Sequence, residues 1–371
     1  MIIAGRQLWN ALSASFEPGW LEVIGGRISR LVWEDFSGTP DVALLGFATP
    51  GLVDVHSHGA GGAAFTEGAA AARIALAAHL EAGTTTVIAS LVTAGLAELR
   101  TQIEALIPLV ENGELAGIHL EGPWISPKQR GAHDPDKLAL PDAQAVEAVL
   151  GYGSEIIRMV TIAPELPGAL EAISSFAAAG IVAAIGHTAA DFAVTQAGVT
   201  AGATGVTHMF NAMPDLKKRE PGPVLAALEA EQVFLELIFD GFHIDPRLAV
   251  FIGKNYPGRT VLITDAMAAA GLGDGDYALG GLPVTVANGQ ARISGTETIA
   301  GSTIRLADAV RLATQAGVPL AAAVGLATAN PAAYLQIPKV GRLDVGFHAD
   351  LVEFDADTLK VCRVMRRGQW R

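Results

Sequence analysis

Histidine and glutamate residues end four apolar runs in the first part of this chain. They are His56 and His58 in GLVDVHSH, Glu121 in AGIHLE, His187 in IVAAIGH and His208 in TGVTH. Two imidazoles with one carboxylate can bind a catalytic zinc ion and leave one position open for water. Octahedral iron or manganese accepts the same ligand types. These residues predict a divalent metal centre, with zinc as the first expectation and iron, manganese or cobalt as alternatives.

His56 and His58 are two positions apart on a strand-like run, so both imidazoles are expected on one face. Asp54 shares that face and is a candidate to orient a ligand ring from behind. The alternative interpretation is that these are hydrogen-bonded core side chains. That alternative rarely explains a buried carboxylate beside two histidines.

Asp265 ends a further apolar run, TVLITD. Zinc lowers the pKa of a bound water to about 7, and a nearby carboxylate can then take the proton and pass it to a leaving group. The alternative role is a helix N-cap, which aspartate favours. His119 and His243 also lie near strand ends, and His119 fits either a supporting role or the core.

The segment 122–135, GPWISPKQRGAHDP, follows Glu121 directly and is rich in proline and glycine. Long loops at this end of a barrel are usually functional. His133 in this loop could donate a hydrogen bond to a developing oxyanion, or be an ordinary loop histidine. Arg219, in the basic triplet KKR, belongs either to a solvated face or to a pocket that grips a phosphate.

Six polar-ended runs must be brought together for this chemistry. They cover residues 51–58, 116–121, 181–187, 204–208, 234–243 and 260–265. Short apolar runs are typical of buried strands, and the parallel strands of a barrel all end at the face where catalytic groups lie. Residues 49–336 alternate such runs with Ala/Leu-rich helical stretches at 69–82, 96–109 and 142–150. This alternation predicts parallel strands with crossover helices, enough for eight βα units.

The two ends of the chain have a different pattern. Residues 1–48 contain β-prone runs around Gly25 and Gly26, and residues 337–371 contain two more at 349–354 and 359–364. We expect a small β-domain built from both ends, and a barrel over 49–336. The Gly-rich stretch 274–295 is the expected β-rich insertion in that barrel.

Composition limits the function classes. The formal net charge of −13 disfavours nucleic acid or anionic membrane as a partner, although it allows a small anionic substrate in a cationic pocket. Mean hydropathy is +0.37, yet no uncharged stretch has the roughly 20 mainly apolar residues of a spanning helix. Cys362 is the only cysteine, which excludes an internal disulfide and favours the reducing cytoplasm.

Taken together, the motifs resemble those of the N-acetylglucosamine-6-phosphate deacetylases, a family of the amidohydrolase superfamily. The matching strings are PGLVDVHSHGAGG, HLEGPWISPKQRGAHDP, GHTAA, THMFNAMP, REPG, DGFH, TDAM and GRLDVGFHADLVEFD. They follow the family's order over nearly the whole chain. The resemblance implies an α/β fold: a (β/α)8 TIM-like barrel with a small β-sandwich domain from both chain termini, usually as a homodimer.

The resemblance also implies roles for single residues. Glu121, His187 and His208 would be the main metal ligands, Asp265 the catalytic carboxylate, and His133 the group that polarises the acetamide carbonyl. Sugar-phosphate contacts are implied for Asn211, Ala212, His243 and Arg219, the last reaching a neighbouring subunit's site. Some members replace the His56–His58 pair and use a single metal, so its presence here allows one or two ions per subunit.

The implied reaction is hydrolysis of the acetamide of N-acetyl-D-glucosamine 6-phosphate to glucosamine 6-phosphate and acetate. A metal-bound hydroxide would be the nucleophile, with Asp265 as general base and then acid. Two enzyme alternatives stay open: another N-acetylhexosamine phosphate, such as the galactosamine epimer, or a cyclic amide. A non-catalytic barrel would have no reason to keep all these groups.

Overall fold

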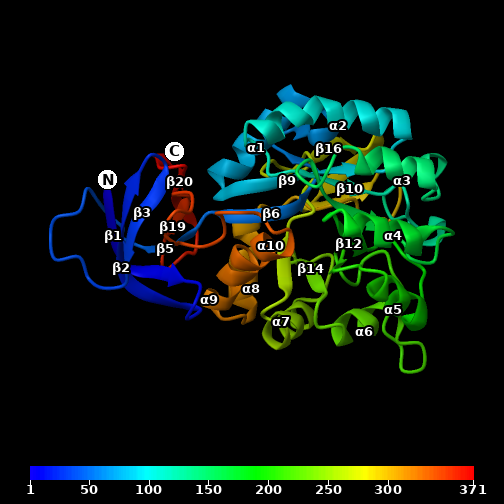
Figure 1. Cartoon of the computed structure of the whole chain (residues 1–371). Helices are drawn as coiled ribbons and strands as arrows, with labels where there is room; N and C mark the ends of the chain where they lie inside the picture. The colour runs from blue at the N-terminus through cyan, green and yellow to red at the C-terminus, as the bar shows by residue number, and fades with distance from the viewer.

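Eight parallel strands form a nearly closed barrel at the centre of the molecule (Figure 1). The computed structural model describes all 371 residues. In sheet order the strands are β15 (Thr260–Ile263), β14 (Phe234–Ile238), β13 (Gly205–Val206), β12 (Val182–Ile185), β11 (Ile157–Ile162), β10 (Ile118–Glu121), β9 (Thr84–Val92) and β6 (Leu52–Ser57). β6 meets the chain just after β15 at a bridge between Ser57 and Ala266. The predicted (β/α)8-type barrel is confirmed.

Helices lie along the outside of this barrel. They are α1 (Ala69–Glu81), α2 (Leu96–Glu111), α3 (Ala143–Leu150), α4 (Ala169–Ala178), α5 (Phe192–Thr200), α6 (Gly222–Glu229), α7 (Pro246–Asn255), α8 (Leu306–Ala316), α9 (Leu320–Leu326) and α10 (Ala329–Tyr334). Three short 3-10 helices are η1 (Phe65–Glu67), η2 (Pro127–Gln129) and η3 (Pro135–Lys137). The periodic stretches at 69–82, 96–109 and 142–150 are all helical. Asp142 caps α3 by accepting a hydrogen bond from the backbone N–H of Ala145.

The barrel strands are largely buried on both faces, and most of their residues are apolar or small polar ones. All nine residues of β9 are buried, for example. A cluster of eleven buried residues joins side chains of six barrel strands to Tyr334 and Leu335, at the C-terminal end of α10. None of the helices combines the length and the hydrophobicity that a membrane span requires.

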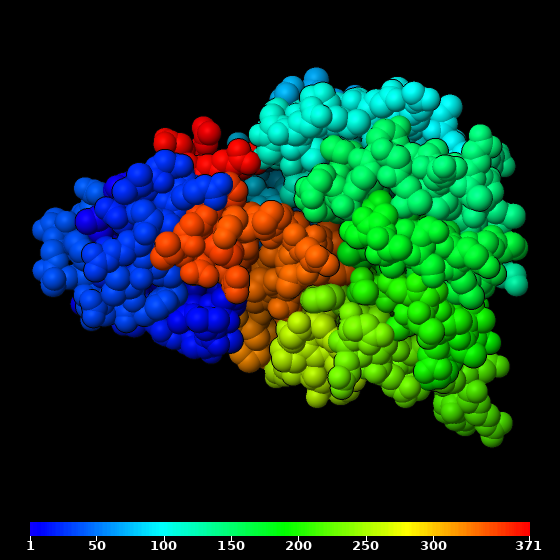
Figure 2. Space-filling model, viewed as in Figure 1, coloured from blue at the N-terminus to red at the C-terminus, as the bar shows by residue number.

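Strands from both ends of the chain form a second, eight-stranded sheet beside the barrel. They are β1 (Ile2–Asn10), β2 (Ser15–Ile24), β3 (Arg27–Val32), β4 (Val42–Ala43), β5 (Phe47–Pro50), β19 (Leu351–Phe354), β20 (Val361–Arg366) and β21 (Gln369–Trp370). β5 pairs with both β1 and β19, so the two ends are hydrogen-bonded along one path. The expected β-domain from both termini is confirmed. Figure 2 shows it as a lobe next to the barrel.

Two small sheets lie outside these two main sheets. β16 (Gly275–Leu279), β17 (Leu282–Ala287) and β18 (Gln290–Ile293) form an antiparallel sheet in the Gly-rich stretch. Its apolar side packs on Val92 and Met267, close to the strand ends. β7 (Gly59–Ala60) and β8 (Ala63–Ala64) form a short hairpin after β6.

Candidate metal centre

The predicted metal ligands and the predicted catalytic carboxylate gather at the carboxyl ends of five barrel strands. His56 lies in β6 and Glu121 ends β10, whereas His187, His208 and Asp265 each stand two residues after a strand. The backbone of these last three has φ of +46°, +29° and +48°. Non-glycine residues in this left-handed region cost about 1–3 kcal/mol each and persist where the surroundings fix them. Here that backbone turns three polar side chains towards one another.

Glu121, His187 and His208 form one compact group. Glu121 Oε1 lies 3.2 Å from His187 Nε2 and 3.0 Å from His208 Nε2, and the two nitrogens are 3.0 Å apart. Ligand atoms held about 2.0–2.2 Å from one ion lie roughly 3.0–3.5 Å from each other. All three residues are buried. Their spacing is that of a coordination shell.

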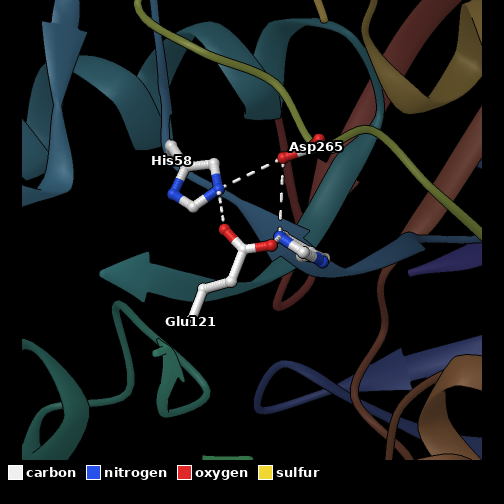
Figure 3. A group of neighbouring side chains, drawn as sticks. His58, Glu121 and Asp265 are labelled. Atoms are coloured by element: carbon white, nitrogen blue, oxygen red, sulfur yellow. Dashed lines mark ion pairs between the residues drawn. The ribbon is translucent and has the colours of Figure 1, made fainter. Parts of the chain in front are cut away.

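His56, His58 and Asp265 form a second group around Glu121, and Figure 3 shows His58 and Asp265 beside the Glu121 carboxylate. His58 Nε2 lies 3.0 Å from Glu121 Oε2 and 3.1 Å from Asp265 Oδ1. His56 Nε2 lies 3.4 Å from Glu121 Oε1 and 3.5 Å from Asp265 Oδ1. Ligand atoms of these four residues all lie within 4.8 Å of one another. The Glu121 carboxylate therefore contacts both groups.

Hydrogen bonds behind the rings fix the proton positions of two histidines. His187 Nδ1 is 2.9 Å from the carbonyl oxygen of Gln129, and His58 Nδ1 is 3.1 Å from that of Ser90. A carbonyl only accepts, so each Nδ1 carries a proton, and in the neutral ring each Nε2 presents a lone pair. Each Nε2 faces carboxylate oxygens. Positive charge between them, either a proton on the ring or a bound metal ion, makes that arrangement favourable.

His56 provides a direct test of the fit to a metal ion. Its Nε2 is buried and has no hydrogen-bond partner, although a buried polar atom is normally paired. The electrostatics around His58 also fit a bound cation. Burial alone would lower the pKa of His58, but hydrogen bonds with Asp265 and Glu121 raise it to about 9. The carboxylates thus attract positive charge into the centre, and the donor set fits a divalent ion.

His133 also faces Glu121, with 3.4 Å between His133 Nε2 and Glu121 Oε2. His133 Nδ1 lies 2.8 Å from the hydroxyl oxygen of Thr93 and 3.3 Å from its backbone nitrogen. Burial, and then the charge of His187, lower the His133 pKa to about 4. The His133 ring is therefore neutral, with Nε2 turned towards the centre. Glu121, His133 and His187 are also close enough to one another to hold an ion.

A cavity of about 450 Å³ opens over the two groups. Its polar lining comprises His58, Glu121, Lys128, Gln129, Arg130, His133, His187, His208, Asn211, His243, Asp265 and Thr298. Ala212 lines it as well, whereas Arg219 does not. Arg219 is exposed, in the segment between β13 and α6 that projects from the barrel (Figures 1 and 2). Lys128 and Arg130, which sequence reasoning did not single out, bring positive charge to the cavity.

His243 is held at the cavity wall by Asp240. His243 Nδ1 lies 2.7 Å from Asp240 Oδ2, and Asp240 Oδ1 accepts the backbone N–H groups of Phe242 and His243. Burial would lower the His243 pKa, but Asp240 raises it above its usual range. The string DGFH indicates this pair in the sequence, because Asp240 stands three residues before His243.

Two supporting roles differ from expectation. Asp54 accepts hydrogen bonds from the backbone N–H of His56 and from Thr264, so it joins β6 to the chain after β15 and does not orient a ring. The carboxylate behind the His56 ring is Glu236, which sequence reasoning missed, with Oε2 3.1 Å from Nδ1. His119 has both ring nitrogens bonded to Ser90 and Thr161, as a buried supporting residue. Asp265 starts no helix.

Comparison with known proteins places this centre in a family. A model described as "Amidohydrolase family" matches residues 47–371. The N-acetylglucosamine-6-phosphate deacetylase of Bos taurus is 36% identical over 92% of this chain and 88% of its own length. The N-acetylgalactosamine-6-phosphate deacetylase of Escherichia coli O157:H7 is 33% identical, over 95% and 96% of the two chains.

A solved structure agrees. The N-acetyl-D-glucosamine-6-phosphate deacetylase of Mycobacterium smegmatis is 42% identical, with a TM-score of 0.95 over 100% of this chain and 99% of that one. The resemblance seen in the motifs is confirmed. The chain belongs to the amidohydrolase family, and within it to the N-acetylglucosamine-6-phosphate deacetylases.

Proposed function

We propose that this protein hydrolyses the acetamide of N-acetyl-D-glucosamine 6-phosphate to glucosamine 6-phosphate and acetate. The observation that carries the proposal is the buried group of Glu121, His187 and His208 beside an ionised Asp265, under a cavity that also holds cationic side chains. Membership of the deacetylase family supports the same reaction.

Glu121, His187 and His208 would hold the principal divalent ion, and His56 with His58 would complete a second position. A bound ion supplies Lewis acidity and lowers the pKa of a coordinated water. We propose zinc, since two imidazoles with a carboxylate are one of its catalytic ligand sets. Iron, manganese and cobalt are the alternatives that elemental analysis would distinguish.

Asp265 is proposed as the proton carrier. Burial would raise its pKa, but the charges of His56 and His58 hold the pKa well below its usual range, so the side chain is ionised. It can accept a proton from the attacking water as oxygen bonds to the acetamide carbon. It then delivers that proton to the amine nitrogen as the C–N bond breaks.

His133 is proposed as the donor to the acetamide oxygen. Its neutral ring turns Nε2 towards the centre, and we propose that this nitrogen carries the ring proton. A fixed donor aimed where negative charge develops stabilises the transition state more than the ground state. This requires a neutral histidine, in agreement with its low pKa.

The sugar phosphate would occupy the rest of the cavity. Asn211, Ala212 and His243 line it and are proposed to contact the sugar. Lys128 and Arg130 are the cations of the same chain that can meet the phosphate. We propose a homodimer in which Arg219 reaches the neighbouring site, since it is exposed and lines no part of its own cavity. The reducing cytoplasm suits a chain whose single cysteine, Cys362, is free.

The test is acetate release measured with N-acetylglucosamine 6-phosphate, its galactosamine epimer and unphosphorylated N-acetylglucosamine. We expect the highest kcat/KM for the first. Comparable rates without the phosphate would contradict the phosphate assignment, and a preference for the epimer would reassign the substrate. Arg219→Ala should chiefly raise KM. Lys218→Ala is the matched control, because Lys218 is an equally exposed neighbour.

A further inference from the structure

Glu236 is a buried carboxylate that the reaction as described does not use. It lies in the middle of β14, in the run FLELI, and its side chain has no exposed surface. No lysine or arginine pairs with it. Its one ion-pairing partner is His56, with Oε2 3.1 Å from Nδ1. Burying a carboxylate without a cation is costly, so a chain that retains one gains something from it.

The contact with His56 fixes which face of that ring is bare. Nδ1–H donates to the carboxylate, so in the neutral ring the lone pair is on Nε2. Nε2 then presents its lone pair, without any hydrogen-bond partner, towards Glu121 and Asp265. A carboxylate behind a ligating histidine fixes the tautomer and raises the basicity of the ligand.

The same oxygen of Glu236 also accepts the backbone N–H of His208 at 3.3 Å. Glu236 therefore links the backbone of His208, a proposed ligand of the principal ion, to the ring of His56, a proposed ligand of the second ion. Its second oxygen, Oε1, has no partner. Tyr334 is close enough that burial, together with the charge of Glu236, raises the Tyr334 pKa, and the Tyr334 hydroxyl is 3.2 Å from Met159 Sδ. No other carboxylate contacts the His56 ring from behind, since Asp54 bonds the backbone and Thr264.

We propose that Glu236 is the positioning residue that makes His56 a metal ligand, and so decides whether this chain binds a second divalent ion beside the principal one. The inference rests on the metal centre of the proposed function. Charge on Glu236 is balanced through the ring of His56 when an ion is bound at Nε2. Without Glu236, no other carboxylate behind the ring holds His56 in the tautomer that binds a metal.

The experiment is a zinc titration of chelator-treated protein, with ions per chain counted by elemental analysis. Wild type should bind two Zn²⁺ per chain. Glu236→Gln keeps the shape but removes the charge, and should weaken the second site by roughly 10- to 100-fold while the first is unchanged. Glu236→Asp keeps the charge but shortens the reach, and should act in the same direction if Gln fails to fold.

His56→Asn should also lose the second ion. Adding Glu236→Gln to it should cause no further loss, because both changes remove the same interaction. Asp54→Asn is the matched control: it alters a buried carboxylate on the strand of His56, and should lower stability without selective loss of one ion.

A wild type that binds one ion, equal weakening of both sites, or additive losses in the double variant would overturn the inference. The metal count is independent of turnover. Two bound ions without acetate release would contradict the proposed function but not this inference. Acetate release by a protein that binds one ion would contradict this inference but not the proposed function.

Discussion

Asp265 owes its predicted role to its immediate neighbours. Its Oδ1 is 3.1 Å from His58 Nε2, and the side chain is almost fully buried. Asp265→Asn keeps the shape but cannot carry a proton. We expect kcat to fall by about 10²–10⁴-fold, with KM and the principal metal nearly unchanged. Acetate-release kinetics measure kcat and KM, and elemental analysis measures the bound metal. A variant that loses the principal metal or the fold would assign Asp265 a structural role.

His243 provides a pH prediction at the same scale. Because Asp240 raises its pKa, His243 keeps its proton to a pH above the ordinary histidine value of about 6.5. If the charged ring grips the substrate, KM should rise only when the pH passes the raised pKa. Asp240→Asn removes the charge but keeps an acceptor for the two backbone N–H groups.

In Asp240→Asn the rise in KM should therefore move to lower pH, to about 6.5 or below, because burial of the ring then acts without the opposing charge. The test is KM measured across the pH range for wild type and Asp240→Asn. The substrate's phosphate ionises identically in both experiments, so a difference between the two profiles comes from the protein. Identical profiles would show that His243 titration does not control binding.

Which residues could be predicted from sequence follows from where each lies on its strand. Glu121, His187 and His208 end apolar runs, and parallel strands of a barrel end at one face, so their meeting was predictable. Glu236 lies in mid-strand, two residues before the apolar end of β14. Its contact with His56 depends on barrel closure and on a β6 whose pairing with β9 shifts register. No local pattern contains that information.

At the scale of elements, the loop after β10 both supports and covers the centre. Its Gln129 carbonyl fixes the His187 ring, and Gly131 lies against that ring with φ of +55°. A Cβ at Gly131 would stand 3.1 Å from His187 Cε1. The sequence predicted a functional loop from its length and position. It did not predict Lys128 and Arg130 as cavity cations, because the loop path depends on how η2 and η3 pack.

Gly131→Ala tests this loop. An alanine at positive φ costs roughly 1–2 kcal/mol, and here the methyl also presses on a proposed ligand. Gly153→Ala is the control, since Gly153 has φ of +77° but nothing within 4 Å of its added Cβ. Both variants should lose similar stability in urea unfolding. Only Gly131→Ala should bind zinc more weakly, by tenfold or more; equal zinc affinity in both would show that the loop does not hold His187.

At the scale of the whole molecule, the sheet from both chain ends is fastened to the barrel by a few specific contacts. Trp9 of β1 is 2% exposed, and its Nε1–H donates to the carbonyl of Ala321 in α9 at 2.8 Å. Arg366 of β20 donates to the carbonyls of Gly113 and Glu114, just after α2. The composition of the ends predicted a β-domain. It carried no signal for these contacts, which join residues hundreds of positions apart.

Trp9→Phe removes the indole N–H and leaves the Ala321 carbonyl without its donor. A lost partner for a buried polar group costs about 1–3 kcal/mol, so the urea midpoint should fall. Trp370→Phe is the matched control, because the Trp370 Nε1 has no hydrogen-bond partner to lose. Zinc affinity and KM should not change in either variant, since neither tryptophan lines the cavity. If the two substitutions lower the midpoint equally, the Trp9 hydrogen bond does not fasten the sheet to the barrel.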